Sequence, residues 1–338
     1  MNFVTGGTGL LGSHLLFKLI SEHQKVRAVY RDEHRLNRVC QLFEYYRPAD
    51  GKELFEQIEW CMCDILDVVQ LEKVMKGCTT VYHCAAMISY NKKDFLDMMK
   101  INREGTFNIV NISLLLGIEK VCFVSSTSAV SVNEENRKAP LIEANKWVQT
   151  TETSGYAISK YSAEKEIWRG IEEGLNAVII NPSVIIGPGI WEESSLTIFK
   201  LISNKFRFYT KGGNAFVDVR DVVNSMFILT EDKSIYSERY LCTGHNLLFY
   251  ELFKLISKEL NQPPPSIYAN TFLSKLAQSA DWFKGLFTGK RTLTGETVRT
   301  SRKITEYDSS KLKAATGRDF YPIEETIRNT VQGRLSNH

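Results

Sequence analysis

The stretch Thr5-Gly6-Gly7-Thr8-Gly9-Leu10-Leu11-Gly12 lies near the start of the sequence, between a short apolar segment, 2–5, and a segment with helical apolar spacing, 10–23. Its three spaced glycines have separate tasks. The first permits a tight turn, the second lets a diphosphate approach the backbone, and the third lets the helix pack closely on the strand. Glycine turns also occur for purely structural reasons, but one that links a strand to a helix predicts a dinucleotide-binding fold.

The rest of the first half alternates between strand-like and helix-like segments. Apolar runs rich in β-branched residues predict strands at 26–30, 58–63, 80–84, 121–125 and 177–186, and the segment 95–116 has a helical pattern. Such alternation is typical of an α/β fold in which a doubly wound parallel sheet is covered by helices on both faces.

The second half is less regular. Helical patterns occupy 194–204, 218–231, 249–261, 270–287 and 323–332, a strand is expected at 239–242, and the run Pro263-Pro264-Pro265 separates two of the helices. We therefore expect a Rossmann domain formed by 1–187 with 214–262, and a smaller, mostly helical substrate-binding region formed by 188–213 with 263–338.

Composition narrows the class of protein. The chain has 338 residues, of which 43% are hydrophobic and 24% charged, and its net charge is +3. This balance is typical of a soluble globular protein and gives no support to nucleic-acid binding or to stable membrane insertion. The glycine turn leaves no room for a signal peptide before it. Seven cysteines without a disulfide-type framework indicate reduced thiols and a cytoplasmic location, and we expect no metal because no ligand cluster has the required spacing.

A second stretch, Tyr156-Ala157-Ile158-Ser159-Lys160, places a phenol and an ammonium four residues apart, on one face of a helix. A free Tyr has a pKa near ~10, and a nearby ammonium or an oxidised nicotinamide ring favours the phenolate. Hydroxyls follow a predicted strand at Val124-Ser125-Ser126-Thr127-Ser128, at the edge where ligands of doubly wound sheets bind. Tyr–Lys pairs are common on surface helices, but here the order of the motifs predicts an enzyme that transfers a hydride at a nicotinamide and a proton through Tyr156.

The end of the second predicted strand bears on the type of cofactor. An acidic residue at this position binds the ribose hydroxyls of NAD. The chain instead has Tyr30 followed by Arg31, with Arg35 and Arg38 nearby, and a guanidinium suits a 2′-phosphate. This pattern favours NADP(H). NAD(H) is the alternative, with Asp32 as the acidic group and the arginines as a solvated cluster.

The chain resembles the extended short-chain dehydrogenases/reductases over essentially its whole length. Besides the two hallmarks, the resemblance is carried by Cys63-Asp64-Ile65-Leu66-Asp67, His83-Cys84-Ala85-Ala86, Ile101-Asn102-Arg103-Glu104-Gly105-Thr106 and Asn181-Pro182-Ser183-Val184-Ile185-Ile186-Gly187-Pro188. It implies catalytic roles for Thr127 (with Ser126 in reserve), Tyr156 and Lys160, a supporting role for Asn102, and binding of the nicotinamide ribose by Lys160. It implies cofactor contacts by Gly6, Thr8, Gly9, Leu10, Leu11, Gly12, Arg31, Asp64, Ile65, Cys84, Ala85, Ala86, Ser125, Tyr156, Lys160, Pro182 and Val184. Met87, Thr127 and Trp191 are the candidates for substrate contact.

Two branches of this family compete. The second-strand sequence 26–32, the segment 212–222 and the late segment 293–299 resemble dihydroflavonol reductases and 3β-hydroxysteroid dehydrogenases. The main alternative is a sugar-nucleotide epimerase or dehydratase that retains NAD, and an alternative of another class is a non-catalytic dinucleotide-sensing module. Asn181 departs from the Arg that many members of the family have.

Two expectations concern surfaces. The apolar and basic segment 272–291 favours a helix that covers the substrate pocket or a subunit interface, and the alternative is a helix lying on a membrane surface. The resemblance also implies a homodimer, formed through the helices at 95–116 and 156–173.

Overall fold

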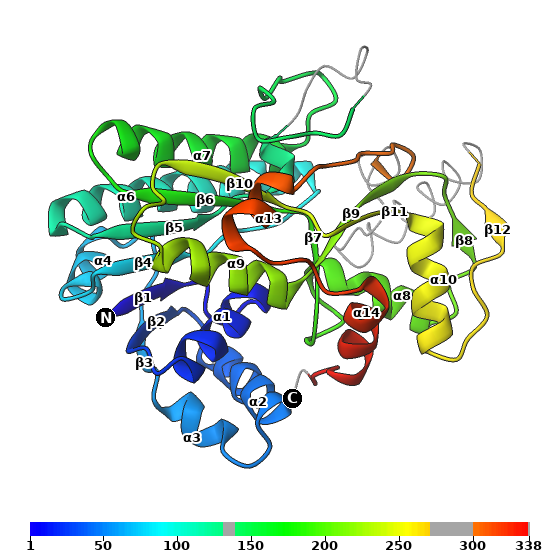
Figure 1. Cartoon of the computed structure of the whole chain (residues 1–338), viewed down its shortest axis with the longest axis horizontal. Coiled ribbons are helices and arrows are strands. Elements are labelled where there is room, and N and C mark those ends of the chain that lie inside the picture. The colour runs from blue at the N-terminus through cyan, green and yellow to red at the C-terminus, as the bar shows by residue number, and fades with distance from the viewer. Residues whose placement is uncertain (131–138, 271–299, 337–338) are drawn as a thin grey trace.

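The computed structural model describes residues 1–130, 139–270 and 300–336, so the expected segment 272–291 and the reductase-like segment 293–299 lie outside the described residues (Figure 1). The main sheet has seven strands in the order β10-β6-β5-β4-β1-β2-β3, and every neighbouring pair is parallel. The strands are β1 (Asn2–Thr5), β2 (Val26–Tyr30), β3 (Glu59–Met62), β4 (Thr80–His83), β5 (Lys120–Val124), β6 (Ala177–Pro182) and β10 (Glu238–Cys242). The α/β, doubly wound architecture expected from the sequence is confirmed.

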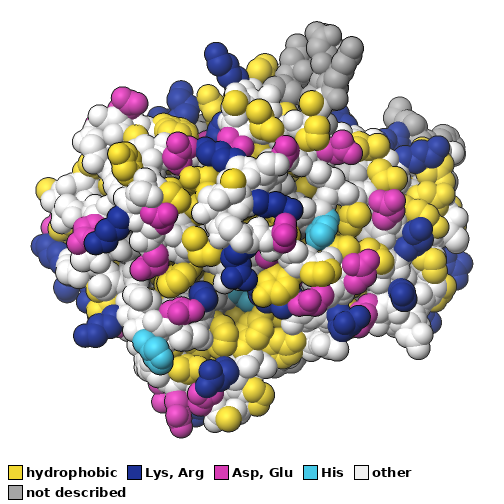
Figure 2. All heavy atoms as spheres, in the orientation of Figure 1, with side chains coloured by type: hydrophobic (Ala, Val, Ile, Leu, Met, Phe, Trp, Pro, Cys, Tyr) yellow, Lys and Arg dark blue, Asp and Glu magenta, His cyan; other side chains and the backbone are white. Residues whose placement is uncertain are grey.

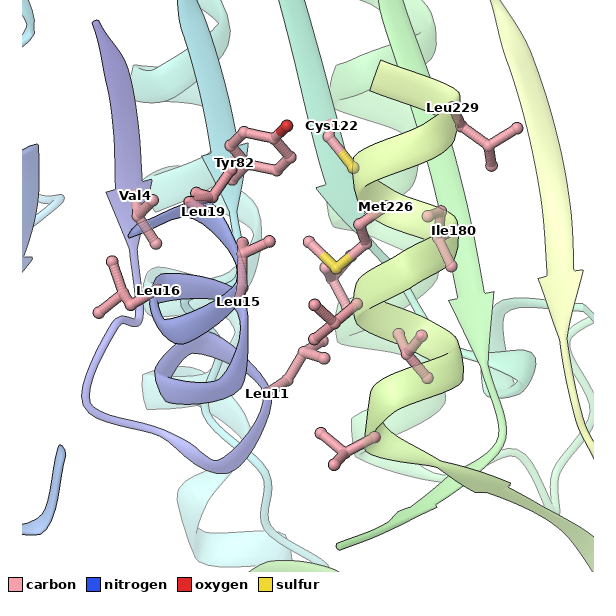
Figure 3. Packing of buried hydrophobic residues seen from close by; sticks show 14 of the residues in the cluster. Val4, Leu11, Leu15, Leu16, Leu19, Tyr82, Cys122, Ile180, Met226 and Leu229 are labelled. Carbon is pink, nitrogen blue, oxygen red and sulfur yellow. The ribbon is translucent and has the colours of Figure 1, made fainter. Parts of the chain in front are cut away.

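Helices cover both faces of this sheet, as Figure 1 shows. On one face lie α1 (Leu10–Ser21), α2 (Leu36–Tyr46), α3 (Gly51–Glu56) and α9 (Val219–Glu231), and on the other α4 (Val68–Met75), α6 (Gly105–Leu116) and α7 (Gly155–Glu172). Figure 3 shows Leu15 and Leu19 of α1 and Met226 of α9 packed over side chains of the central strands. Since both faces of the sheet are covered, the strands β1, β5 and β6 are buried at every position rather than alternately.

The expected single strand at 177–186 is wrong in one respect, because the structure divides it in two. Its first part, β6, belongs to the main sheet, and its last part, β7 (Val184–Ile186), pairs with β9 (Gly213–Asp218) in a separate three-stranded sheet that includes β11 (His245–Leu248). Hydrophobicity hides the break, since both parts are largely buried. The backbone N–H of Ser183 still bonds to Cys242 O, and the chain leaves the main sheet after that residue.

The smaller region is formed by segments that are far apart in sequence. It contains α8 (Thr197–Ser203), α10 (Phe249–Glu259), α14 (Ile323–Gln332) and a two-stranded sheet of β8 (Phe208–Tyr209) and β12 (Ile267–Tyr268). These elements share a third hydrophobic cluster that includes Trp191, Phe216 and Ile327. The shorter helix α13 (Ser310–Thr316) lies near α9 and β10. The exact division of the chain into two domains stays a prediction.

The expected helix at 95–116 is not one regular helix. It begins as α5 (Phe95–Met98), continues as a π-helical segment, Met99–Glu104, and becomes α6 at Gly105. Single π-helical turns are typical of functional sites, because the extra residue re-aims a side chain. Within the described residues, no helix combines the length and the apolar character needed to cross a bilayer. On the face shown in Figure 2, basic and acidic side chains are interspersed, which agrees with the small net charge.

Candidate active site

The glycine turn has the close contacts that its pattern predicts. Gly6 has a φ of +69°, and a Cβ there would lie 2.7 Å from Ala85 N; a Cβ on Gly12 would lie 2.1 Å from Gly6 O. Gly9 is different, because its Cβ would meet only one atom, at 3.4 Å. Gly9 also precedes α1, whose first turn has no side-chain cap and no acidic residue. A close-packed turn with an open middle glycine at an uncapped helix start fits a dinucleotide diphosphate.

A buried chain of hydrogen bonds fixes the strand ends beside this turn. Thr106 Oγ1 donates to Asn102 O at 2.5 Å, so it accepts from His83 Nε2 at 3.0 Å. His83 Nδ1 then accepts from Thr5 Oγ1 at 2.7 Å, and Thr5 Oγ1 accepts from Ala85 N at 3.2 Å. Burial lowers the pKa of His83 to about 3, with a smaller contribution from Lys160, so the ring is neutral. His83 is therefore a structural residue, which joins β1, β4 and α6.

The arginines expected at the ribose end of the cofactor site have separate partners. Arg31 lies 3.8 Å from Asp64, and the two side chains are 61% and 43% exposed. Arg35 lies 3.7 Å from Asp32. Arg38 donates to Glu193 at 2.6 Å and so joins α2 to the loop that precedes α8. Of the three basic residues, Arg31 is therefore paired with the Asp64 that the family resemblance also assigns to the cofactor.

Tyr156 and Lys160 are both buried on the first turns of α7. The phenol is 9% exposed and its ring centre lies 6.0 Å from that of Tyr90. Lys160 is 2% exposed, its Nζ donates to Val124 O at 2.7 Å, and it lies 4.9 Å from the centre of the Phe123 ring. The Tyr–Lys pair therefore lies at the carboxyl end of β5, where ligands of this fold class bind.

Burial dominates the pKa of Tyr156 in this structure, and the expected lowering by Lys160 and an oxidised nicotinamide stays a prediction. Burial, with a smaller effect of Tyr90, raises the pKa of Tyr156, and a hydrogen bond from Ser126 opposes the rise. Burial also lowers the pKa of Lys160 to about 8, and Glu164 and Cys84 oppose that change. The phenol is thus held in its protonated form, which is the form a proton donor needs.

The hydroxyls after β5 have different partners. Ser125 Oγ donates to Glu164 at 2.6 Å, whereas Ser126 Oγ accepts from Ser128 N at 3.1 Å and is the hydroxyl that opposes the effect of burial on the pKa of Tyr156. Thr127 begins a short 3₁₀ turn, in which its carbonyl accepts from Val130 N. Ser126, the reserve choice, is thus the hydroxyl whose influence reaches the phenol, and the catalytic roles of Thr127 and Ser126 both stay predictions.

Asn102 faces inward from the π-helical segment and is 1% exposed. Its amide oxygen accepts from Met87 N at 2.7 Å, and its amide nitrogen donates to Met87 O at 2.9 Å and to Ser159 Oγ at 2.9 Å. Ser159 Oγ in turn donates to Tyr156 O at 2.8 Å. Asn102 therefore joins the loop after β4 to the helix that presents Tyr156, and its supporting role in catalysis stays a prediction.

Sequence analysis missed Glu164, a carboxylate that is 1% exposed, one helical turn beyond Lys160. It accepts from Ser125 at 2.6 Å, from Asn181 Nδ2 at 2.8 Å, from Arg239 at 2.9 Å and from Trp168 Nε1 at 3.2 Å. Asn181 Nδ2 also donates to Ser126 O at 2.9 Å. The four-residue spacing after Lys160 was the available signal, but an acidic residue at that spacing is usually a solvated one.

The other expected site residues surround these groups in different ways. Ala85 and Ala86 follow β4, and Met87 is held there by Asn102. Ile65 O accepts from Asn108, and the Ile65 side chain fills the space above Gly105. Trp191 is only 2% exposed and packs against Phe199 and Arg334, so the structure gives it a packing role. Substrate contact by Trp191, like the cofactor contacts of Thr8, Leu10, Leu11, Cys84, Pro182 and Val184, stays a prediction.

Comparison with known proteins identifies the family. Residues 2–240 match the model of the NAD dependent epimerase/dehydratase family. The chain is 26% identical over 347 residues to the "Putative dihydroflavonol 4-reductase" of Synechocystis sp., covering 99% of this chain and 94% of that protein. It is 28% identical over 266 residues to the "Sterol demethylase protein B" of Methylococcus capsulatus (78% and 76% covered), and 29% identical over 264 residues to anthocyanidin reductase of Arabidopsis thaliana (72% and 75% covered).

Solved structures agree on the fold. The structure of gox2253 is 25% identical, with a TM-score of 0.78 and 98% and 97% of the two chains covered. Gre2 of Candida albicans in complex with NADPH has a TM-score of 0.73 at 20% identity, with 98% of each chain covered. UDP-glucuronic acid 4-epimerase of Bacillus cereus in complex with NAD has a TM-score of 0.75 at 16% identity, with 98% and 97% covered.

The fold and the site together define an oxidoreductase that uses a nicotinamide dinucleotide and acts on carbonyl or alcohol groups. More specifically, the chain belongs to the NAD dependent epimerase/dehydratase family, and its relatives include dihydroflavonol reductase-like and anthocyanidin reductase enzymes.

Proposed function

We propose that the enzyme is an NADP(H)-dependent reductase in which Tyr156 gives its proton to a substrate carbonyl oxygen. The single observation that carries this assignment is the burial of a protonated phenol beside Ser126 and one helical turn from Lys160. When bound, the nicotinamide supplies the hydride, which adds to the carbonyl carbon. Ser126 is suited to hydrogen-bond the same oxygen, and Lys160, mostly cationic at pH 7, to stabilise the phenolate that remains.

The choice of NADP(H) is supported by Arg31, since an exposed guanidinium suits a 2′-phosphate, and by the NADPH complex of a structural neighbour. NAD(H) is the alternative, because another neighbour was solved with NAD. We propose a small carbonyl compound or secondary alcohol as the substrate, from the printed names of the reductase relatives. A cytoplasmic location is supported by seven free cysteines, four of them buried.

The decisive experiment is replacement of Tyr156 by Phe, which removes only the phenolic oxygen. NADPH binding, followed by quenching of protein fluorescence, should persist while carbonyl-dependent NADPH oxidation is lost. Tyr161→Phe is the matched control, because Tyr161 lies on the same helix and stacks on Trp147 at 4.1 Å without needing its hydroxyl for that contact. Turnover by the Tyr156→Phe variant at the wild-type rate would refute the assignment.

The epimerase alternative makes a different prediction about the purified protein. An enzyme that recycles its cofactor keeps NAD through dialysis, whereas a reductase exchanges NADP(H) in every turnover. Extraction of the denatured protein followed by nucleotide chromatography distinguishes the two. Stoichiometric NAD would favour the epimerase.

We also propose a homodimer formed through α5, α6 and α7. Leu96, Phe107 and Leu115 are 76%, 41% and 70% exposed, although they are large and apolar. A groove of about 490 Å³ lies on this face. It is lined by Leu96, Met99, Lys100, Arg103, Glu104, Phe107 and Glu166. Light scattering of the eluted protein should give twice the monomer mass, and Leu96→Glu should give a monomer; a monomeric wild type would remove this proposal.

A further inference from the structure

We propose that Glu164 is a positioning residue with two tasks: it holds the Ser125–Ser126 corner at the carboxyl end of β5, and it places a buried negative charge one helical turn from Lys160. The proposal rests on the proposed function, because it concerns the same site. It goes beyond that function by assigning part of the catalytic geometry to a carboxylate whose two oxygens both accept hydrogen bonds from protein groups.

The hydrogen-bond donors around the Glu164 carboxylate support its role in positioning. One oxygen, Oε2, accepts from both Ser125 Oγ and Asn181 Nδ2, and the same Asn181 nitrogen reaches Ser126 O at 2.9 Å. Glu164 thereby anchors Ser125 directly and Ser126 through one intermediate. A buried charged acceptor makes stronger hydrogen bonds than a neutral one, and removing it leaves several donors without a partner. Ser126 owes its position beside the phenol to this arrangement.

The other oxygen, Oε1, accepts from Trp168 and from Arg239, which reaches it from β10, the edge strand. Arg239 also donates to Glu143 O, while Leu241 N donates to the Glu143 carboxylate. The Glu164–Arg239 ion pair is therefore buried, with side chains 1% and 17% exposed. A buried carboxylate needs such a partner, since an unpaired charge in this position would be too costly to keep.

Titratable, aromatic and backbone groups from several elements surround Lys160. Glu164 and Tyr156 face it from its own helix, Cys84 and the neutral His83 from β4 and the residue after it, and the Phe123 ring and Val124 O from β5. Among these groups Glu164 is the carboxylate, and it is the largest influence opposing the effect of burial on the pKa of Lys160. Without the Glu164 charge, Lys160 would lose its proton at a lower pH.

The test is Glu164→Gln, which keeps the shape and removes the charge. On the alkaline side of the pH profile, kcat/KM for carbonyl reduction should begin to fall at a pH that is lower by roughly one unit. The reason is that Lys160 loses its proton at a lower pH when the Glu164 charge is absent. Arg239→Gln should move the profile in the same direction but by less, because the buried carboxylate takes up a proton more readily without its cation and so loses part of its charge. Ser125→Ala should reduce kcat without moving the profile, because it removes a hydrogen bond and no charge.

Controls separate these effects from general damage. Glu166→Gln is the matched control, because Glu166 is also buried on α7 but pairs with Arg103 and Arg169 on its other side. Glu164→Asp keeps the negative charge, so its pH profile should lie closer to the wild-type profile than that of Glu164→Gln. Unmoved profiles in both Glu164→Gln and Arg239→Gln would overturn the charge role, and an unchanged kcat in Ser125→Ala would overturn the positioning role.

A binding measurement keeps the proposal separate from the proposed function. Lys160 is suited to contact the nicotinamide ribose, so the pH dependence of NADPH affinity, measured by fluorescence, should shift in Glu164→Gln in the same direction as activity. This measurement needs no turnover. If the wild type reduces no carbonyl while the binding shift is present, the proposed function fails and the role of Glu164 stands; if the shift is absent, the role of Glu164 fails.

Discussion

The two ends of the proposed cofactor site, a ribose end and a catalytic end, differ in how they hold their charges. At the ribose end, Arg31 and Asp64 lie 3.8 Å apart with side chains 61% and 43% exposed. At the catalytic end, Lys160 and Glu164 are 2% and 1% exposed and are held by hydrogen bonds from several elements. Water and salt weaken the attraction between Arg31 and Asp64, whereas the charges of Lys160 and Glu164 are buried in a medium where charges act strongly.

This contrast suggests how the site can change without losing its chemistry. An exposed ion pair contributes little to stability, so its residues can be exchanged at small cost and cofactor preference can shift. A buried charge belongs to a network in which each group needs its partners. We therefore expect substitutions at the catalytic end to have the larger effects and to be insensitive to salt.

The largest effect is expected for Lys160→Met, which replaces the buried ammonium by an uncharged chain of similar length. Val124 O loses its donor and the Tyr156 phenolate loses its cation. We expect kcat for carbonyl reduction to fall by roughly a thousandfold, within the range typical of acid–base groups. The exposed Lys165 on the same helix provides the control, Lys165→Met. A loss under tenfold would show that the ammonium is dispensable.

The second prediction concerns Asn102→Ala, which removes three buried hydrogen bonds at once. Leaving both the N–H and the carbonyl of Met87 without this partner should destabilise the protein by about 2–4 kcal/mol. Urea unfolding followed by circular dichroism measures the loss, and turnover should fall about tenfold because α7 is no longer fixed to the loop after β4. Asn91→Ala, near the surface of the same loop, should change stability by less than ~1 kcal/mol.

The same contrast explains what the sequence predicted. The glycine turn could be predicted because it depends on close backbone contacts. At Gly6 and Gly12 a Cβ atom would collide with neighbouring backbone atoms, so these positions require glycine. That Tyr156 and Lys160 share one face of a helix could be predicted from their four-residue spacing. Local spacing of this kind is the information that a single sequence carries directly.

Contacts between segments that are far apart in the sequence could not be predicted from it. Arg239 reaches Glu164 across 75 positions, Asn181 reaches Ser126 across 55, and the division of 177–186 into two strands depends on β9, which follows later in the chain. Tertiary packing decides such features.

The third prediction returns to the exposed end. Arg31→Ala should weaken NADPH binding about tenfold relative to NADH, a change of ~1.4 kcal/mol, because one exposed cation near a phosphate is lost. The difference should shrink as salt is raised from low to high concentration, which fluorescence titration can follow. Arg47→Ala, which breaks an exposed pair with Asp50, is the control. An unchanged NADPH-to-NADH ratio would remove Arg31 from cofactor selection.

The smallest effect is expected for Asp64→Asn. The side-chain oxygen that accepts from Leu66 N is retained, but the negative charge beside Arg31 is lost. Repulsion of a 2′-phosphate should therefore decrease, and NADPH should gain about two- to threefold over NADH at low salt. If Asp64 also contacts the adenosine, both cofactors weaken together while their ratio still moves toward NADPH. The ratio therefore isolates the charge effect from the contact, and a ratio that moved toward NADH would show that Asp64 is needed to hold Arg31 in position.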